Sequence, residues 1–198
     1  MVKLYTGRGD EGDTDLFGGQ RAGKDALRIA AVGDVDELNA WIGMAAANCS
    51  FDDLKSSLLA LQSRLFELGA DLATPRKAEP DRKETEAKAP PRAGVPRIEQ
   101  SQVEDVERQI DAIDGHLPVM RQFVLPGGTV LAARLHVART VCRRAERVCV
   151  ALGRHEPLGD ALPIYLNRLS DLLFAMARRA NQLAGVPDVP WQSPRQQK

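Results

Sequence analysis

The hydrophobic residues of this chain recur with the period of an α-helix in five separate stretches. In the second stretch, leucines alternate spacings of four and three residues, which is typical of a seam in a left-handed helical bundle. The stretches at about 129–152 and 162–184 carry apolar stripes of the same kind. No stretch alternates convincingly between apolar and polar residues, so the pattern predicts an all-α protein, a five-helix bundle with left-handed up-down packing. The leucines of the second stretch are Leu54, Leu58, Leu61, Leu65, Leu68 and Leu72.

Two capping signals predict where the first and third helices begin. Asp34 is followed three residues later by Glu37, and Ser101 is followed by Glu104. Such pairs form a capping box, in which both side chains accept hydrogen bonds from free amides of the first turn. We therefore expect the first helix to begin at Asp34 and the third at Ser101.

Three segments show no helical period, and each lacks it for a different reason. Residues 1–33 hold seven of the sixteen glycines, which predicts an ordered glycine-rich loop with a short extended piece at residues 3–6. Residues 74–97 hold five of the twelve prolines and many charges, so they are expected to form a flexible surface loop. The polar residues 186–198 are expected to be a loose tail. The whole chain, 1–198, is predicted to be one domain.

Composition restricts the partners more than the fold. The 27 basic and 27 acidic residues give a formal net charge of zero, so nothing global favours a nucleic acid or an anionic membrane. The sequence shows neither a signal peptide nor an 18-residue apolar run, and we expect a cytoplasmic protein without membrane contact. Cys49, Cys142 and Cys149 form no CxxC pair and are expected to be reduced thiols.

A basic cluster marks the fourth helix at "VCRRAERVCV", residues 141–150. At 100° per residue, His136, Arg143 and Arg147 fall together on the face opposite the apolar stripe, with Arg144 beside them. Like charges one turn apart repel each other, and Glu146 is the only acid nearby. The cluster is therefore either a solvated basic face or a site that collects an anion.

On the fifth helix, Asn167 and Asp171 lie one turn apart, at one flank of the apolar stripe. They form an ordinary polar flank, or Asn167 donates a hydrogen bond to a sugar or a phosphate. The three histidines are scattered and no Glu-x-x-His pair occurs, so the sequence indicates neither a zinc site nor a di-iron site.

The stretch "TGRGDEGDTDLFGG", residues 6–19, has the glycines of a phosphate-binding loop but the opposite charge. Its first ten residues carry one cation, Arg8, against four acids. The pattern GxGxxG occurs at residues 7–12, but neither a Walker sequence nor a strand–loop–helix unit accompanies it. The stretch is a plain surface loop, or it is half of an anion site whose cations come from elsewhere.

Read in order, five stretches of the sequence resemble the PduO-type corrinoid adenosyltransferases, also called ATP:cob(I)alamin adenosyltransferases. The stretches are "LYTGRGDEGDTDLFGGQRAGKD", "VGDVDELNAWIG", "FVLPGG", "CRRAER" and "LNRLSDLLFAMAR". The resemblance implies an enzyme that transfers the 5′-deoxyadenosyl group of ATP to cob(I)alamin, giving adenosylcobalamin and triphosphate. It further implies a homotrimer with active sites between subunits, Mg²⁺ bound with ATP, and a separate flavoprotein reductase.

The resemblance also implies roles for individual residues. Arg143, Arg147 and Asp36 would be catalytic, with Asp36 pairing with Arg143 across the subunit boundary. Phe123 would line the cobalamin pocket beside the lower face of the cobalt. The metal ligands are not assigned. Glu146 would belong to the ATP site by orienting the arginines. The other ATP contacts would be Thr6, Gly7, Arg8, Gly9, Thr14, Asp15, Lys24, Arg143, Arg144, Arg147 and Asn167.

One departure from the family pattern leaves a role open, and two other functions compete with catalysis. The family usually has a basic residue where this chain has Gly7, so Arg8 either takes over its phosphate contact or does not. The chain could instead be a non-catalytic bundle that delivers adenosylcobalamin to another enzyme. It could also be a helical scaffold whose basic face docks an acidic partner. Turnover of ATP and cob(I)alamin distinguishes an enzyme from a delivery protein and from a scaffold.

Overall fold

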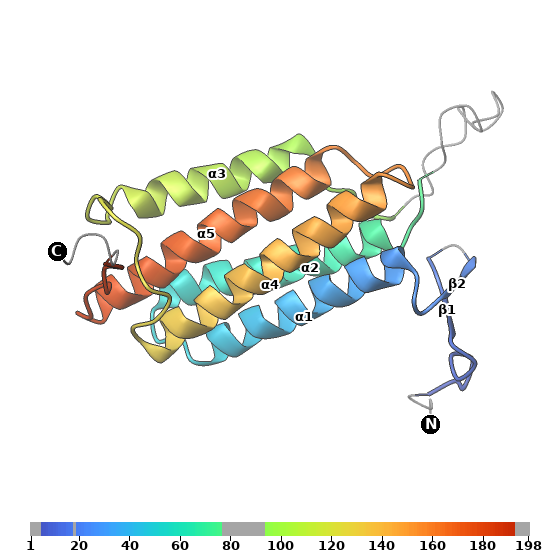
Figure 1. Ribbon diagram of the computed structural model, residues 1–198, viewed down its shortest axis with the longest axis horizontal. Coiled ribbons are helices and arrows are strands. Elements are labelled where there is room, and N and C mark those ends of the chain that lie inside the picture. The colour runs from blue at the N-terminus through green and yellow to red at the C-terminus, as the bar shows by residue number, and fades with distance from the viewer. Residues whose placement is uncertain (1–4, 18, 77–93, 193–198) are drawn as a thin grey trace.

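The computed structural model describes residues 5–17, 19–76 and 94–192, and in this part of the chain five long helices form one bundle (Figure 1). Successive helices run in opposite directions, so the predicted five-helix up-down bundle is confirmed. No described helix is long and apolar enough to span a membrane. The helices are α1 (Leu27–Ala47), α2 (Asp52–Leu72), α3 (Gln100–Asp114), α4 (Val130–Gly153) and α5 (Ala161–Leu183).

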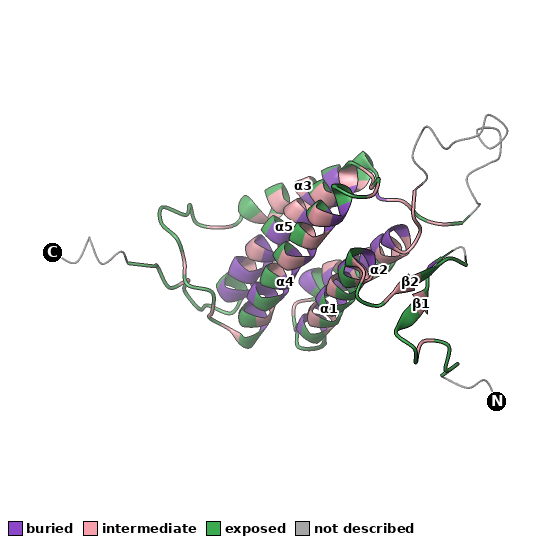
Figure 2. Cartoon of the chain, turned by 45° about the vertical axis from the view of Figure 1, so that its right-hand side comes forward, coloured by how far each residue is buried: buried purple, intermediate pink, exposed green. Residues whose placement is uncertain are grey.

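The core lies where the apolar stripes of the helices face one another. All six leucines of the α2 seam are buried, as predicted, and Figure 2 shows buried residues on the inward sides of the helices. Helix α4 is central, since it packs against both α1 and α5. The three cysteines are buried and free, as expected, and burial raises the pKa of the Cys142 thiol. These thiols belong to the packing of the bundle.

The prediction that the first helix begins at Asp34 was wrong. Helix α1 begins at Leu27, so Asp34 lies inside the helix, two turns from its start. The added turns are held by the core, because Ala31 is fully buried and the guanidinium of Arg28 donates to Glu156 and to the Leu72 carbonyl. A capping signal is local, and here burial of the residues before it decides the boundary.

The start of α3 also differs from the prediction. Its N-cap is Glu99, whose side chain forms a capping box with Gln102, instead of Ser101 with Glu104. The helix therefore begins at Gln100, one residue before the predicted start. In contrast, α4 begins at Val130 with Thr129 as its N-cap, and the Thr129 side chain accepts a hydrogen bond from the Ala132 amide.

The glycine-rich region before α1 contains a small sheet that the sequence did not predict. Strand β1 (Asp13–Asp15) pairs antiparallel with β2 (Arg21–Gly23), and Thr14 faces Ala22. The buried side chain of Leu16 and a hydrogen bond of 2.9 Å from the Phe17 amide to the Ala73 carbonyl attach the sheet to the end of α2. Residues 3 and 4 of the predicted extended piece lie outside the described residues, and residues 5 and 6 are not in a strand.

The two loops expected to be flexible are anchored where the structure describes them. Residues 77–93 of the 74–97 loop lie outside the described residues. On either side of that gap, Arg76 and Arg97 both pair with the buried carboxylate of Asp71, at 3.4 and 2.5 Å. Residues 186–192 do not form a loose tail, since Pro190 forms a β-bridge with Val124. Residues 193–198 lie outside the described residues.

Candidate functional site

Three arginines one turn apart on α4 form what we call the arginine stripe: Arg139, Arg143 and Arg147. Arg143 and Arg147 are exposed, and neither forms a hydrogen bond or an ion pair within the described residues. Arg139 is half-buried, and its Nε has no hydrogen-bond partner. Burial and, secondly, the charge of Arg143 lower the pKa of Arg139. Unpaired cations at this spacing repel by roughly a few tenths of a kcal/mol, so the stripe is suited to binding an anion.

Arg139 is a candidate that the sequence analysis missed. The cluster at 141–150 drew attention to the adjacent pair Arg143 and Arg144, whereas Arg139 lies outside it. The signal was nevertheless present, because Arg139, Arg143 and Arg147 are spaced by four residues and such positions share a helical face.

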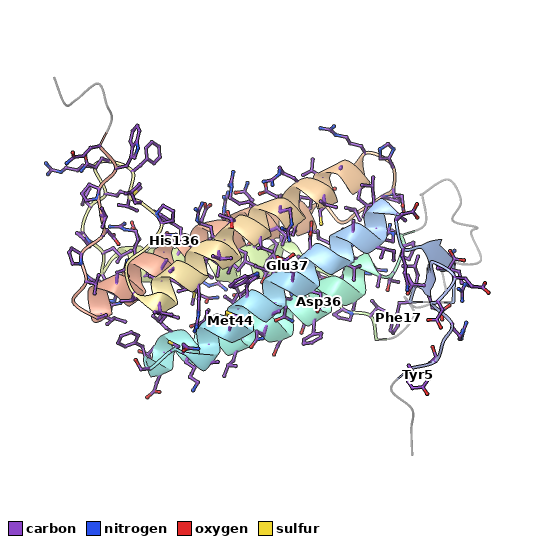
Figure 3. The ribbon with its side chains drawn as sticks, turned by 60° about the horizontal axis from the view of Figure 1, so that its bottom comes forward. Tyr5, Phe17, Asp36, Glu37, Met44 and His136 are labelled. Atoms are coloured by element: carbon purple, nitrogen blue, oxygen red, sulfur yellow. The ribbon has the colours of Figure 1, made fainter. Side chains whose placement is uncertain are left out.

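His136 does not lie on the exposed face that the sequence predicted. It is 5% exposed and packs against Phe174, with ring centroids 5.9 Å apart. Figure 3 shows His136 near the end of the bundle where α4 begins. Burial is the main cause that lowers its pKa; Arg139 adds to the shift and Asp188 opposes it. The last turns of α5 cover this part of α4, whereas the described residues leave Arg143 and Arg147 uncovered.

Glu146 and Asn167 meet beside the arginine stripe. The Asn167 amide donates a hydrogen bond of 3.0 Å to Glu146 Oε1, which joins α5 to α4. Arg168 donates to the side-chain oxygen Oδ1 of Asn167 at 3.4 Å and to Glu107 at 2.8 Å. Within the described residues no hydrogen bond joins Glu146 to the stripe, so its role in orienting the arginines stays a prediction.

Arg144 lies beside the stripe on α4 but points toward α1. Its guanidinium donates to Asp34 at 3.0 Å and also to Glu37, which joins α4 to α1. In Figure 3, Glu37 lies on the side of α1 that faces α4. The hydrogen bond to Asp34 is the main cause that raises the pKa of Arg144. Arg144 is thus a tie between two helices in the single chain; this pairing competes with its predicted contact with ATP, which no observation tests.

We expect Arg144→Ala to lower the free energy of unfolding by about 1 kcal/mol or less, because all three partners are partly exposed and such pairs contribute little. Turnover per folded molecule should stay close to that of the wild type. Urea unfolding and steady-state rates measure the two effects. A large loss of turnover with unchanged stability would instead move Arg144 into the phosphate site.

Two of the four acids of the glycine-rich loop, Asp13 and Asp15, are paired with arginines of the region before α1. Asp15 lies 3.2 Å from Arg8 and 3.6 Å from Arg21, and Arg21 also lies 3.9 Å from Asp13. Arg21 also donates a hydrogen bond of 2.9 Å to the Arg8 carbonyl. The pairing of β1 with β2 therefore brings in a cation that the count over residues 6–15 left out.

The loop glycines allow a close approach that side chains would block. Gly7 has a φ of +70°, a conformation that other residues adopt only at a cost, which is the local reason for a glycine at this position. A Cβ on Gly9 would lie 3.2 Å from the Lys24 ammonium nitrogen. Lys24 therefore lies across Gly9, and within the described residues its ammonium forms no ion pair.

The predicted site residues fall into groups that lie far apart in one chain. Figure 1 shows the glycine-rich loop at the end of the bundle where α1 begins and the segment with Phe123 at the opposite end. These ends are separated by α4, which at 24 residues is about 36 Å long. Asp36 is exposed on the side of α1 away from α4 (Figure 3), and Phe123 is 75% exposed. Within the described residues, no hydrogen bond or ion pair joins residues 6–24 to α4.

A groove of about 760 Å³ lies between α3 and α5 and contains none of the predicted site residues. Glu107, Asp111, Arg168 and Asp171 give it a charged wall. Phe174, Val119 and Met120 give it an apolar one, at the end that carries the Phe123 segment.

Comparison with known proteins gives consistent matches over nearly the whole chain. Residues 4–180 match the family described as cobalamin adenosyltransferase. The chain is 44% identical to the corrinoid adenosyltransferase of Bacillus subtilis, covering 96% of this chain and 93% of that protein. It is 42% identical to the cobalamin adenosyltransferase of Cupriavidus metallidurans, covering 99% and 97%. A solved variant of the PduO-type ATP:corrinoid adenosyltransferase of Lactobacillus reuteri, complexed with cobalamin and ATP, superposes with a TM-score of 0.84 at 40% identity, covering 96% and 100%.

Proposed function

The chain belongs to the cobalamin adenosyltransferases, as a PduO-type enzyme that transfers the adenosyl group of ATP to cobalamin, and from this we propose which residues do the work. The observation that carries the assignment is the arginine stripe, in which Arg143 and Arg147 are exposed and have no partner within the described residues. Charge-assisted, often bidentate contacts make arginine the preferred partner of phosphate oxygens. We assign the stripe to the triphosphate of ATP.

The glycine-rich loop supplies the second half of this site. Backbone amides near Gly7 and Gly9 approach an anion without hindrance from side chains, and Lys24 adds a charge beside them. The hydroxyl groups of Thr6 and Thr14 are further donors. Asp15 holds Arg8 in place through their ion pair. Arg8 therefore stabilises the conformation of the loop and also offsets part of its negative charge.

The two halves come together between subunits of a homotrimer. Within the described residues no hydrogen bond or ion pair joins the loop to the stripe, while each is exposed and open to a neighbouring copy. A head-to-tail contact repeated three times closes a ring with three equivalent sites. Asp36 is exposed, and no carboxylate contact within the described residues holds Arg143, so the pair Asp36–Arg143 forms across the same boundary.

The loop carboxylates are suited to Mg²⁺ that arrives with ATP. Protein sites usually hold Mg²⁺ through one or two carboxylates together with phosphate oxygens. Within the described residues, Asp10 and Glu11 are exposed and unpaired, and no cluster of three or more His, Cys, Asp or Glu side chains could hold a metal ion alone. When bound, Mg²⁺ shields the charge of the triphosphate.

The cobalamin supplies the nucleophile, and the protein supplies the geometry. Cob(I)alamin attacks C5′ of ATP, so cobalt, C5′ and the departing triphosphate have to lie in line; orientation of this kind is worth about 7–11 kcal/mol. Arg143 and Arg147 stabilise the charge that develops on the leaving triphosphate. Phe123 provides an apolar wall below the cobalt, which excludes axial ligands and makes cob(II)alamin easier for a separate flavoprotein reductase to reduce.

One assay tests the proposed function as a whole. The protein is incubated with ATP, Mg²⁺ and chemically reduced cob(I)alamin, and the corrin spectrum and triphosphate are followed together. We expect adenosylcobalamin and triphosphate in equal amounts. Binding of both substrates without either product would indicate a delivery protein. No binding of either substrate would favour a scaffold whose basic face docks an acidic protein partner.

We expect Asp36→Asn to weaken the trimer or to lower turnover, because removal of the carboxylate leaves Arg143 without its charged partner across the boundary. Interfacial charge pairs of this kind are worth about 1.5 kcal/mol or more. Sedimentation velocity and steady-state rates measure the two effects. As a control, thermal unfolding of the variant checks that the substitution at this exposed position leaves the fold intact. A trimer with unchanged cohesion and unchanged turnover would refute the pair.

A further inference from the structure

The C-terminal residues form a two-stranded ribbon with the segment that carries Phe123. The Leu125 amide donates to the Val189 carbonyl at 2.8 Å, and the Trp191 amide donates to the Phe123 carbonyl at 2.7 Å. These bonds flank the antiparallel bridge between Val124 and Pro190. The register therefore places Trp191 opposite Phe123.

One face of this ribbon is apolar and exposed. Facing residues and residues two apart along a strand point to the same side, so Phe123, Leu125, Val189 and Trp191 share a face. Their exposed fractions are 75%, 48%, 53% and 45%. Exposed apolar groups of this size that lie together mark a binding surface. We call these four residues the apolar face.

A buried polar cluster at the end of α5 fixes the ribbon to the bundle. Arg178, which is 6% exposed, donates from Nε to Asp188 at 2.9 Å and from its terminal nitrogen to the Pro118 carbonyl at 2.8 Å. Asn181, which is 2% exposed, donates to Asp188 at 3.2 Å and to the Gly127 carbonyl at 3.1 Å. Both ends of the Phe123 segment are therefore tied directly to these two side chains, and the C-terminal strand is tied to the same two side chains through Asp188.

We propose that the C-terminal strand Val189–Trp191 is a working part of the corrinoid site: Trp191 extends the wall begun by Phe123, and Asp188 is the positioning residue that holds the strand and the wall in place. This inference rests on the proposed function, in which Phe123 faces the corrinoid. A corrin ring is a broad, flat apolar surface, and one phenyl ring covers little of it. The apolar face offers a second aromatic side chain and two aliphatic ones on the same side.

Arg178 and Asn181, with Asp188 between them and the C-terminal strand, explain why the segment keeps its shape without a core of its own. The Phe123 segment lies between α3 and α4 and contains prolines and glycines, so its backbone has few partners inside itself. A displacement of about 1 Å at a reacting centre can lower a rate by about 10²-fold. Buried charge-assisted hydrogen bonds from Arg178 are suited to preventing such a displacement.

The test compares Trp191→Ala and Asp188→Asn with the wild type in the full chain. With cob(I)alamin and ATP, we expect the KM for cob(I)alamin to rise about tenfold in Trp191→Ala, the loss typical of one aromatic contact at a binding surface. We expect Asp188→Asn to raise it as well and Asp188→Glu to recover part of the loss. The KM for ATP should stay within about twofold of the wild type in each variant, because the phosphate site is not touched.

Two controls keep the result specific. Gln192→Ala changes the next residue along the chain and should leave the KM for cob(I)alamin unchanged. Trp191 is exposed, so its replacement should leave the thermal unfolding temperature near that of the wild type, even if Asp188→Asn unfolds more easily. If the wild type is active and both variants keep the wild-type KM for cob(I)alamin, this inference is overturned while the proposed function stands. A wild type that makes no adenosylcobalamin would overturn the proposed function and this inference with it.

Discussion

Replacing Arg143 or Arg147 by alanine is expected to lower kcat by about 10²–10³-fold, which is typical of removing one group that stabilises charge in the transition state. Both side chains are exposed and form no hydrogen bond or ion pair within the described residues, so the substitutions break no contact inside the chain. The bundle within each chain should therefore keep its stability, and loss of the Arg143 charge also relieves repulsion on Arg139. Initial rates with chemically reduced cob(I)alamin and thermal unfolding give the two readouts.

The matched control for this prediction is Arg144→Ala, on the same turn of the same helix. Arg144 is held by Asp34 and Glu37, so its loss should affect stability slightly and turnover little. Arg143→Lys should restore turnover only in part, because lysine keeps the charge but loses the bidentate geometry. If Arg143→Ala and Arg147→Ala both turned over at the wild-type rate, the arginine stripe would not bind the triphosphate.

Replacing Phe123 by alanine is expected to affect two assays unequally. Starting from cob(II)alamin and a reductase, adenosylcobalamin formation should fall about tenfold more than when it starts from chemically reduced cob(I)alamin. The reason is that an axial ligand on cobalt opposes reduction, and removal of the apolar wall lets water reach that position. Phe123 is 75% exposed, so the substitution should not disturb the core.

The visible and EPR spectra of cob(II)alamin bound in the presence of ATP give an independent readout of the same substitution. The wild type should lower the population of cobalt with an axial ligand, and Phe123→Ala should restore it. Phe66, which is 72% exposed on α2, offers an aromatic control far from the ribbon in sequence. An equal loss in both assays, with an unchanged spectrum, would remove Phe123 from the reduction step.

The leucine seam of α2 shows what a sequence pattern predicts well. Leu58, Leu65 and Leu72 are all fully or almost fully buried, because repeated burial of one face is decided by the helix period alone. Helix starts are weaker predictions, since a capping signal competes with the packing of residues before it. Asp34 had a suitable partner in Glu37, yet both carboxylates ended up beside Arg144 on a helix that begins earlier.

The candidate site was predicted only in part, because the helix period gives the face of a residue but not its neighbours. Spacing along α4 correctly placed Arg143 and Arg147 on an exposed face. It placed His136 wrongly, because an angle around one helix does not reveal which neighbour covers each turn, and Phe174 covers His136. The role of the C-terminal strand was also beyond the sequence, since its pairing with Phe123 depends on a meeting of distant segments at one end of the bundle.

The central claim is that the loop of one subunit and the arginine stripe of its neighbour make one site, and mixed trimers test it most directly. Lys24→Ala and Arg143→Ala, each nearly inactive alone, are co-expressed in equal amounts with different tags, and trimers that carry both tags are purified. In a head-to-tail ring, every trimer that carries both tags has one boundary in three that joins an intact loop to an intact stripe, so we predict recovery of about a third of the wild-type rate. A mixture no more active than the separate variants would contradict the claim and return the whole site to a single chain.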